Sequence, residues 1–310
     1  MKILITGVHG FVGSNFVKAL AKEHTIYGLD IVSPNKEGVR YTFSWDFLDE
    51  EGEIPDVDAI IHLAGKAHDT KNQSAADVYF KVNTELTKKI YDYFLASKTA
   101  KKFIFFSTAK AAADKVDGIL TEDVVPSPIG PYGESKIAAE KYIQEHLVAD
   151  KQVYILRPCM IHGPGNKGNL NLLYGVVKKG IPWPLGAFEN RRTFTSIGNL
   201  CFVINGLLSK DVPTGIYNMG DDEALSTNEL IEEICKSLGK KAHIWKLPKS
   251  LMTGIAKVGG MLHLPLDSER LRKLTENYIS SNAKIKNALG VEKMPVDARS
   301  GLQSTLESFK

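Results

Sequence analysis

Two side chains that could exchange a proton with a substrate stand four residues apart in the segment Tyr-Gly-Glu-Ser-Lys, at Tyr132 and Lys136. If this segment is helical, the two side chains lie on one face, because residues i and i+4 are neighbours on a helix. A lysine ammonium beside a phenol favours the phenolate and is expected to lower its pKa. A tyrosine tuned in this way can act as an acid or base toward a hydroxyl group near neutral pH. The same spacing recurs at Tyr174 and Lys178, so the spacing alone does not identify a site.

Thr108 supplies a third group, because it ends the apolar run KFIFFST at 102–108, 24 residues before Tyr132. Ligands of doubly wound sheets bind beyond the carboxyl ends of the strands. A hydroxyl there could therefore bond the same substrate oxygen as Tyr132, whereas the alternation of side chains along a strand should turn Ser107 away. We predict that Thr108, Tyr132 and Lys136 are catalytic and that they need no metal.

A glycine loop near the N-terminus could hold a dinucleotide. Gly7, Gly10 and Gly13 follow the apolar run KILIT at 2–6 and precede a stretch with helical character from Asn15 to Lys22. In such a strand–loop–helix unit one glycine permits the tight turn, one lets the backbone approach a pyrophosphate, and one lets the helix pack on the strand. The free N–H groups of the helix then face the phosphates. This context predicts a nicotinamide dinucleotide site.

Asp30 closes the next apolar run, TIYGLD at 25–30. A carboxylate at this position accepts hydrogen bonds from the adenosine ribose and repels an added 2′-phosphate. The nearest arginine is Arg40, so we expect NAD as the cofactor rather than NADP.

These groups need a scaffold that brings strand ends together. Four continuous apolar runs, at 2–6, 25–30, 59–64 and 102–108, are typical of strands buried on both faces of a parallel sheet. Helical stretches lie between them, including Asn83 to Ser97 and about Ser135 to Leu147. The alternation predicts an α/β fold with a doubly wound parallel sheet. VYILRP at 153–158 and GIYNMG at 215–220 are expected to add strands.

The second half of the chain has a different composition and a different pattern of apolar residues. Residues 162–190 are rich in Gly, Pro and Asn and predict loops and short helices, and the chain from Ser226 onward is mostly helical. We predict a dinucleotide-binding domain over 1–165 plus about 195–220, and a smaller C-terminal substrate-binding part formed by 166–194 and 221–310.

The composition narrows the class of protein. Lys plus Arg number 39 and Asp plus Glu 36, which gives no reason to expect a nucleic-acid partner. The lysine-rich stretch from Lys236 to Lys257 is interpreted as a solvated helical face. No run of about 18 apolar residues predicts a membrane span, and no signal peptide is recognised, so a cytoplasmic protein is expected. The three cysteines, Cys159, Cys201 and Cys235, form no metal-binding pattern. His62 and His68 lack a third ligand, and we expect no metal site.

Several motifs in order resemble the extended short-chain dehydrogenase/reductase family, the nucleotide-sugar epimerases and dehydratases. The matching segments are GVHGFVG (7–13), Asp30, HLAG (62–65), ST (107–108), YGESK (132–136), LRP (156–158) and HGPGNKGN (162–169). The resemblance covers roughly residues 1–220 and implies a Rossmann-type sheet. It also implies roles for individual positions: Gly7, Gly10, Phe11 and Val12 at the pyrophosphate; Asp46 and Phe47 at the adenine; Leu63, Ala64 and Gly65 at the nicotinamide; and Asn169 and Arg192 at the substrate diphosphate. Arg191 is a rival to Arg192, since either guanidinium could grip phosphate oxygens.

The residues beside Thr108 bear on the reaction. Members of the family that are 4,6-dehydratases carry Asp and Glu after Ser-Thr, whereas this chain has Ala109 and Lys110. An elimination needs a carboxylate to move its protons, so the dehydratase interpretation fails. The first hypothesis for the reaction is therefore an NAD-dependent 4-epimerase of a UDP-hexose or UDP-N-acetylhexosamine. The alternative hypothesis is a 4-ketoreductase of a UDP-4-keto-6-deoxy-hexosamine. STAKAAA (107–113) and PLGAFENRRTF (184–194) resemble the subgroup that serves capsule and O-antigen sugar pathways, which contains both activities. A third hypothesis is that the protein is a non-catalytic dinucleotide sensor.

The helices predicted at 83–97 and 135–148 could also join two copies of the chain in a homodimer.

Overall fold

The centre of the protein is a seven-stranded parallel sheet with the order β10-β7-β5-β4-β1-β2-β3. The computed structural model describes residues 1–48, 55–66, 75–166, 168–262 and 266–310. The strands are β1 (Lys2–Thr6), β2 (Thr25–Leu29), β3 (Tyr41–Phe43), β4 (Ala59–His62), β5 (Lys102–Phe106), β7 (Gln152–Pro158) and β10 (Gly215–Met219). The chain leaves β1 for β2 on one side and returns to β4 on the other. The order therefore reverses between β1 and β4, which is where doubly wound sheets bind ligands.

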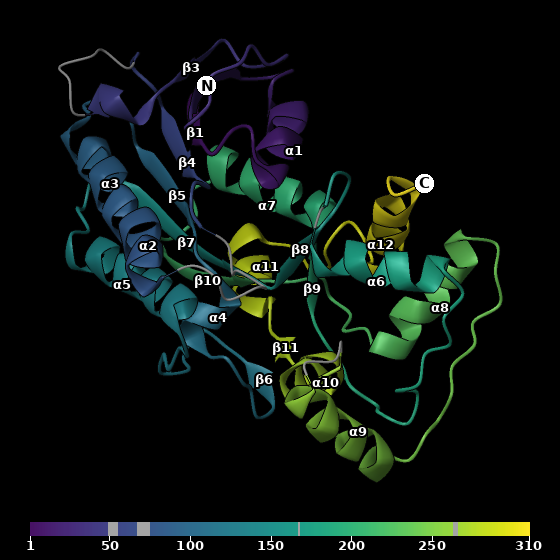
Figure 1. Ribbon diagram of the computed structural model, residues 1–310. Helices are drawn as coiled ribbons and strands as arrows, with labels where there is room; N and C mark the ends of the chain where they lie inside the picture. Colours follow the sequence, from purple (N-terminus) through teal and green to yellow (C-terminus); the bar gives the residue numbers. More distant parts are fainter. Residues whose placement is uncertain (49–54, 67–74, 167, 263–265) are drawn as a thin grey trace.

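Helices cover both faces of the sheet (Figure 1). One face packs against α1 (Phe11–Leu20), α7 (Ile197–Ser209) and α11 (Ala283–Leu289). The other packs against α3 (Leu86–Ala96) and α5 (Pro131–Glu145). Because each strand is buried from both sides, its side chains are apolar without alternation. This explains the continuous apolar runs and confirms the predicted α/β fold.

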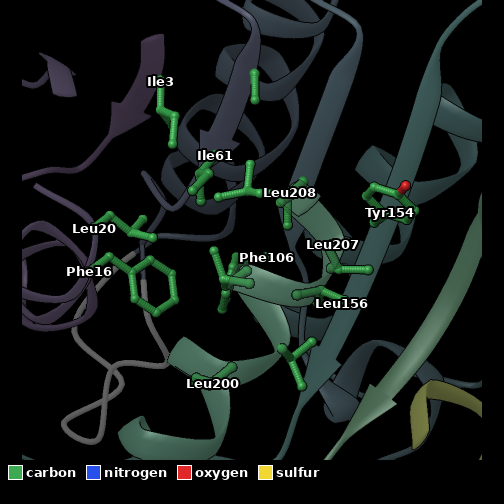
Figure 2. Close-up of a cluster of buried hydrophobic side chains, with 14 of the residues drawn as sticks. Ile3, Phe16, Leu20, Ile61, Phe106, Tyr154, Leu156, Leu200, Leu207 and Leu208 are labelled. Atoms are coloured by element: carbon green, nitrogen blue, oxygen red, sulfur yellow. The ribbon is translucent and has the colours of Figure 1, made fainter. Parts of the chain in front are cut away.

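The first face carries the larger apolar cluster of the sheet (Figure 2). Ile3 and Ile61 from the sheet meet Phe16 of α1 and Leu200 and Leu207 of α7, all with no more than traces of exposed surface. Burying side chains of this size contributes about 1.5–3 kcal/mol each. The cluster holds the helix that follows the glycine loop against the strand that precedes it.

The elements outside the sheet form a third apolar cluster. They include α6 (Asn169–Lys178), α8 (Thr227–Ser237), α9 (Lys249–Met261), α10 (Ser268–Thr275) and α12 (Ala298–Glu307). Figure 1 shows α6, α8, α9 and α10 to the right of and below the sheet. Two short parallel pairs, β8 (Met160–His162) with β9 (Phe194–Ser196) and β6 (Ile119–Leu120) with β11 (Ile279–Ser280), connect these parts.

The remaining short elements are η1 (Trp45–Leu48), α2 (Ala76–Tyr79), the π-helical turn η2 (Phe80–Glu85) and α4 (Ala109–Ala112). Sequence analysis predicted six strands of the sheet within a few residues but missed the edge strand β3. Only three residues long, β3 is too short to show a hydrophobic period. The division into two domains stays a prediction; the structure adds that Ile285 and Leu289 of α11 belong to the cluster on the sheet.

Candidate active site

The glycine loop joins β1 to α1 in the predicted conformation. Gly7 has φ 69°, a left-handed value that favours glycine. A Cβ added to Gly13 would lie 2.3 Å from the carbonyl oxygen of Gly7, so only glycine fits where α1 starts against the loop. Gly10 precedes the helix, and no side chain caps the first turn of α1. Free N–H groups and open backbone thus meet at one point, where a pyrophosphate is favoured.

Asp30 follows β2 and is tied to the same loop. Its carboxylate accepts hydrogen bonds from the amides of His9, at 3.0 Å, and Ile31, at 2.8 Å. Sequence analysis missed Lys36, whose ammonium donates to Ser14 Oγ of α1 at 2.7 Å and is attracted by Asp30. The signal was present as a lysine six residues after the acidic residue. The contact of Asp30 with the adenosine ribose stays a prediction. The positive charge of Lys36 lies within electrostatic reach of its carboxylate.

The two residues predicted at the adenine lie on η1, just after β3. Phe47 packs edge-on against Phe43 with ring centroids 4.9 Å apart. Asp46 is exposed and accepts a bond from Ser44 Oγ at 3.3 Å. Because β2 and β3 are parallel neighbours, η1 and Asp30 share one edge of the sheet. The position of Asp46 and Phe47 near the adenine stays a prediction.

The loop 63–65 is held by a buried chain of polar groups below it. The hydroxyl of Thr87 donates to the Asn83 carbonyl, so it accepts a proton from His62 Nε2 at 2.9 Å. His62 Nδ1 therefore accepts from the hydroxyl of Thr6, at 2.7 Å. The oxygen of Thr6 in turn accepts the amides of residues 63 and 64, at 3.1 and 2.9 Å. Burial holds the pKa of His62 well below its ordinary value, which fits a neutral ring at the end of β4.

Leu63, Ala64 and Gly65 lie between the glycine loop and the catalytic helix. A Cβ on Gly7 would approach the Ala64 amide nitrogen to 3.0 Å, and a Cβ on Gly65 would approach Lys136 Nζ to 3.0 Å. The structure thus brings the predicted nicotinamide loop next to one of the predicted catalytic residues.

Thr108 and Tyr132 come together as predicted. Thr108 follows β5, and its hydroxyl lies near enough to the phenol of Tyr132 to lower the pKa of that phenol. The same hydroxyl caps α4 by accepting the amide of Lys110 at 3.3 Å. Gly133 permits this approach, because a Cβ there would lie 2.8 Å from the Lys110 carbonyl. Sequence analysis did not predict that Gly133 of the YGESK motif allows this close approach.

The prediction that Lys136 lowers the pKa of the Tyr132 phenol is wrong for the protein without a bound cofactor. Burial raises the pKa of the phenol, and the nearby Thr108 hydroxyl offsets this only in part. The ammonium of Lys136 instead donates to the carbonyl of Phe106 at 2.9 Å and lies 4.9 Å from the centre of the Phe105 ring. Sequence spacing placed the two side chains on one helix face but did not reveal this acceptor.

Lys136 is itself perturbed. Its side chain is buried, and burial lowers its pKa to about 8, against the attraction of the Glu140 carboxylate. At neutral pH the ammonium is therefore still charged, with its proton less firmly held than on an exposed lysine. Its position beside Gly65 suits a bond to the ribose next to a nicotinamide.

Asn83 is a buried polar residue that sequence analysis treated as the start of an amphipathic helix. It lies in the π-helical turn η2, a distortion that is frequent at functional sites. Its amide oxygen accepts from the Lys66 backbone at 2.7 Å, and its nitrogen donates to Ser135 Oγ at 3.0 Å. Asn83 thereby connects the nicotinamide loop to α5. The sequence could have indicated this role, because Asn83 is a polar residue on an otherwise apolar helix face.

Ser107 points away from Thr108, as predicted, and joins a buried ion pair. Its hydroxyl donates to Glu140, whose carboxylate also accepts from Arg157 Nε at 3.0 Å and Nη2 at 2.6 Å. Both charged side chains are almost completely buried. The pair fastens α5 to the ends of β5 and β7, and so fixes the helix that carries Tyr132 and Lys136.

The residues predicted at the substrate diphosphate lie beyond the sheet. Asn169 is the first residue of α6, is exposed, and stands at a helix N-terminus that no side chain caps. Arg192 is half-buried, donates to the carbonyl of Lys273, and lies within electrostatic reach of Cys159. The rival Arg191 is engaged with Glu229, at 2.9 Å. The two predicted roles stay predictions, and both guanidinium groups already have a partner within the protein.

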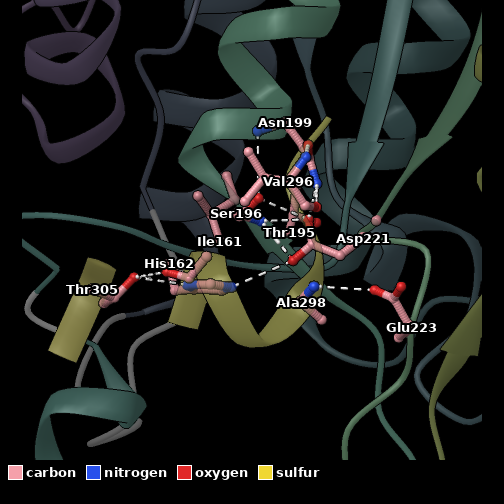
Figure 3. A network of polar contacts seen from close by, with 12 residues as sticks. Ile161, His162, Thr195, Ser196, Asn199, Asp221, Glu223, Val296, Ala298 and Thr305 are labelled. Atoms are coloured by element: carbon pink, nitrogen blue, oxygen red, sulfur yellow. Dashed lines mark hydrogen bonds and ion pairs between the residues drawn. The ribbon is translucent and has the colours of Figure 1, made fainter. Parts of the chain in front are cut away.

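A second polar network stabilises the substrate side (Figure 3). Thr305 donates to the carbonyl of Gly301, so it accepts a proton from His162 Nδ1, 2.9 Å away. His162 Nε2 lies 3.5 Å from Asp221, whose carboxylate also accepts from Ser196 and Asn199. These bonds join β8, β9, α7 and α12 behind the loop that leads to Asn169.

The other candidates from the sequence have structural explanations. Tyr174 is buried, and its ring packs against Phe309 at 5.3 Å, while Lys178 lies over the same ring. His68 lies outside the described residues. Among the residues that the structure describes, no group of His, Cys, Asp and Glu could hold a metal ion. In the same part of the chain, no helix has the length and apolar character to cross a membrane.

Comparison with known proteins identifies the class that this fold and site define. The NAD dependent epimerase/dehydratase family matches residues 3–220, and the chain belongs to that family. A UDP-glucose 4-epimerase from Vibrio cholerae is 31% identical over 99% of this chain and 95% of its own length. An N-acetyl-alpha-D-glucosaminyl-diphospho-ditrans,octacis-undecaprenol 4-epimerase from Escherichia coli O157:H7 is 27% identical over 80% of this chain and 76% of its own length.

Solved structures show the same fold. A UDP-glucuronic acid 4-epimerase from Bacillus cereus in complex with NAD is similar with a TM-score of 0.76, at 22% identity, over 100% of this chain and 98% of that one. WbmG from Bordetella bronchiseptica in complex with NAD and UDP reaches a TM-score of 0.76 at 20% identity, over 99% of this chain and 94% of that one.

The protein is therefore an NAD-dependent enzyme of the nucleotide-sugar epimerase and dehydratase group. The residues present fit the dinucleotide. Gly13 stands where a Cβ would collide with the loop, and the uncapped start of α1 faces the same point. Asp30, Gly65 and Lys136 stay predicted contacts of the cofactor.

Proposed function

We propose that the protein is a 4-epimerase of a nucleotide-diphosphate sugar, with a UDP-hexose or UDP-N-acetylhexosamine as substrate. The observation that carries this proposal is the proximity of the Thr108 hydroxyl to the Tyr132 phenol, on the helix whose Lys136 approaches the loop at Gly65. A sugar hydroxyl placed against the two hydroxyls would have its carbon turned toward the nicotinamide position.

Tyr132 is the acid and base of this mechanism. It takes the proton from the oxygen on sugar C4 and later returns it, while Thr108 holds that oxygen by a hydrogen bond. NAD, held by the glycine loop, Asp30 and Lys136, would supply the hydride acceptor and donor for C4 and a positive charge that favours the phenolate of Tyr132. Between the two transfers the sugar is a 4-ketone that must turn in the site. Lys136 holds the ribose, and Asn169 and Arg192 retain the diphosphate during the turn.

The residues next to Thr108 support epimerisation over dehydration. Ala109 and Ala111 present methyl groups, and Lys110 forms an ion pair with Asp114 at 3.0 Å. The Asp and Glu that characterise the dehydratases at this place are absent from the sequence here. The turn that follows Thr108 therefore offers no carboxylate that could remove a proton from sugar C5.

One observation favours a second candidate, the reduction of a UDP-4-keto-6-deoxy-hexosamine with an external reduced cofactor. Lys36 places a positive charge within electrostatic reach of Asp30, in the region where a 2′-phosphate would need a cation. A reductase would release the oxidised cofactor after each turnover, whereas an epimerase regenerates it in place.

Incubation with UDP-glucose and UDP-N-acetylglucosamine, without added cofactor, tests the proposal. The expected result is the 4-epimer of one of them, detected by NMR spectroscopy. Tyr132→Phe should lower the rate by about 10²–10⁴-fold, because it removes the proton-transfer group. Tyr174→Phe is the matched control and should retain activity, since no group among the described residues hydrogen-bonds the buried Tyr174 hydroxyl.

Full activity of Tyr132→Phe would refute the mechanism. Consumption of NADH or NADPH on a 4-keto sugar, without epimerisation, would establish the reductase instead. Binding of NAD with no turnover of any nucleotide sugar would favour the dinucleotide sensor.

A further inference from the structure

The lysine-rich segment of the sequence contains a helix with an unexpected exposed face. Helix α9 buries Met252, Ala256 and Gly259 against the protein, at a helical spacing. Four apolar side chains at the same spacing remain between 44% and 64% exposed: Leu251, Ile255, Val258 and Leu262. They form a continuous stripe beside the buried one, because residues i, i+4, i+7 and i+11 lie on one side of a helix. Sequence analysis interpreted this segment as a solvated face, which should be polar.

This stripe lies at the margin of the molecule. Figure 1 shows α9 at the lower edge, beside α10, with which it makes its main helix contact. Met261, at the end of the helix, is 80% exposed, and Trp245, just before the helix, is 54% exposed. The Trp245 backbone is fixed by bonds to Trp183 and Gly186, so its indole is presented from a rigid position. Exposed apolar surface gathered on one element marks an interaction site more often than scattered single residues do.

The charge around the stripe identifies the partner. Lys236–Leu262 contains six lysines and no aspartate, glutamate or arginine. Within the described residues, Lys241, Lys246 and Lys257 are exposed and form no ion pair with a carboxylate. The nearest acidic residue at the end of the helix, Asp267, caps α10 and pairs with Arg270 at 3.6 Å. An exposed apolar stripe on a helix whose own and preceding residues carry lysines and no acidic side chain complements an anionic lipid bilayer.

We propose that α9 and its lysine-rich approach, residues 240–262, form a docking surface for an anionic phospholipid membrane. The stripe Leu251, Ile255, Val258 and Leu262 enters the boundary between headgroups and acyl chains. The lysines reach the phosphates, because their long stems allow the ammonium to lie away from the helix axis. The enzyme then acts from the membrane surface, and this inference is independent of which sugar it binds.

Flotation of the full-length protein with lipid vesicles tests the proposal. Binding is expected with vesicles of phosphatidylcholine mixed with phosphatidylglycerol, less binding with phosphatidylcholine alone, and release at high salt. The double variant Ile255→Asp, Val258→Asp should lose at least about tenfold in vesicle affinity, since it charges the centre of the stripe. Val125→Asp is the matched control, because Val125 is 83% exposed and lies outside this surface.

The lysines are tested separately. Lys246→Glu and Lys257→Glu should each weaken binding to anionic vesicles by about fivefold or more, corresponding to the contribution of one basic residue near a charged surface. Lys98→Glu, an exposed lysine on the sheet side, should leave binding unchanged. Circular dichroism of each variant confirms that its fold is intact.

Two results would overturn the proposal. One is equal binding of the wild type and the Ile255→Asp, Val258→Asp variant to anionic vesicles, or no binding by either. The other is a wild-type dimer in solution that this double variant converts to a monomer, because the stripe would then belong to a second copy of the chain. Epimerase activity on a soluble nucleotide sugar is measured in parallel, so a failure of docking remains distinct from a failure of the proposed function.

Discussion

Replacing Lys136 by methionine should make the protein more stable at neutral pH while abolishing its activity. Burial lowers the pKa of this lysine from the ordinary 10.5 to about 8. At about 1.4 kcal/mol for each pKa unit, keeping the ammonium charged in this site costs about 3 kcal/mol. The variant loses the bond to the Phe106 carbonyl, worth about 1 kcal/mol. The net expectation is a gain of about 2 kcal/mol in the free energy of unfolding.

The gain should depend on pH in a defined direction. Between pH of about 8 and 10.5 the unfolded chain binds more protons at this lysine than the folded chain does, so wild-type stability rises with pH. The advantage of Lys136→Met is therefore full below about pH 8 and shrinks as the pH approaches 10.5. Urea unfolding of both proteins without added cofactor, at pH 7 and at pH 9.5, measures this difference.

Lys151 offers a matched control for that experiment. Its side chain is also buried, but its ammonium donates to the carbonyls of Phe94, Leu95 and Ser97 at the end of α3. Lys151→Met should be destabilising by about 1–3 kcal/mol, because it leaves these carbonyls without their donor. A loss of stability in Lys136→Met at pH 7, of the size seen in Lys151→Met, would refute the reasoning.

Three further predictions concern the cofactor, the scaffold and the reaction. Gly13→Ala should weaken NAD binding at least about tenfold by calorimetry, because its Cβ would lie 2.3 Å from the Gly7 carbonyl; unchanged affinity would contradict this. Arg157→Met should lower the free energy of unfolding by about 3–5 kcal/mol in urea, because Glu140 is left buried and unpaired; a neutral result would show that water replaces the pair. The kcat/KM of the wild type should fall about tenfold per pH unit above about pH 8, as Lys136 loses its proton, and a flat profile to pH 10 would exclude that role.

Local patterns in the sequence were sufficient to predict the glycine loop and every strand of the sheet except β3. Strands buried on both faces must be apolar throughout, so β1, β4 and β5 appear as continuous apolar runs. Gly7 needs a left-handed backbone and Gly13 has no room for a Cβ, so the loop is visible as spaced glycines. Thr108, Tyr132 and Lys136 were predicted because a strand end and a helical repeat are both local features.

The properties of those residues depended on contacts between distant segments. The pKa values of Tyr132 and Lys136 are governed by burial, which the spacing along a helix cannot report. Asn83 is drawn into the site by bonds to Lys66 and Ser135, residues 17 and 52 positions away. Lys36 comes beside Asp30 because the loop after β2 folds back onto α1.

The sequence by itself determined the α/β scaffold, the dinucleotide loop and the identity of the catalytic candidates, because each follows from steric or periodic constraints within a few residues. Tertiary structure alone decided which acceptor holds Lys136, which polar groups are buried beneath the nicotinamide loop, and which face of α9 is covered. The lysine-rich segment illustrates the difference. Its composition is compatible with a solvated helix, and only the packing of Met252 and Ala256 against the protein shows that Ile255 and Val258 are left facing outward.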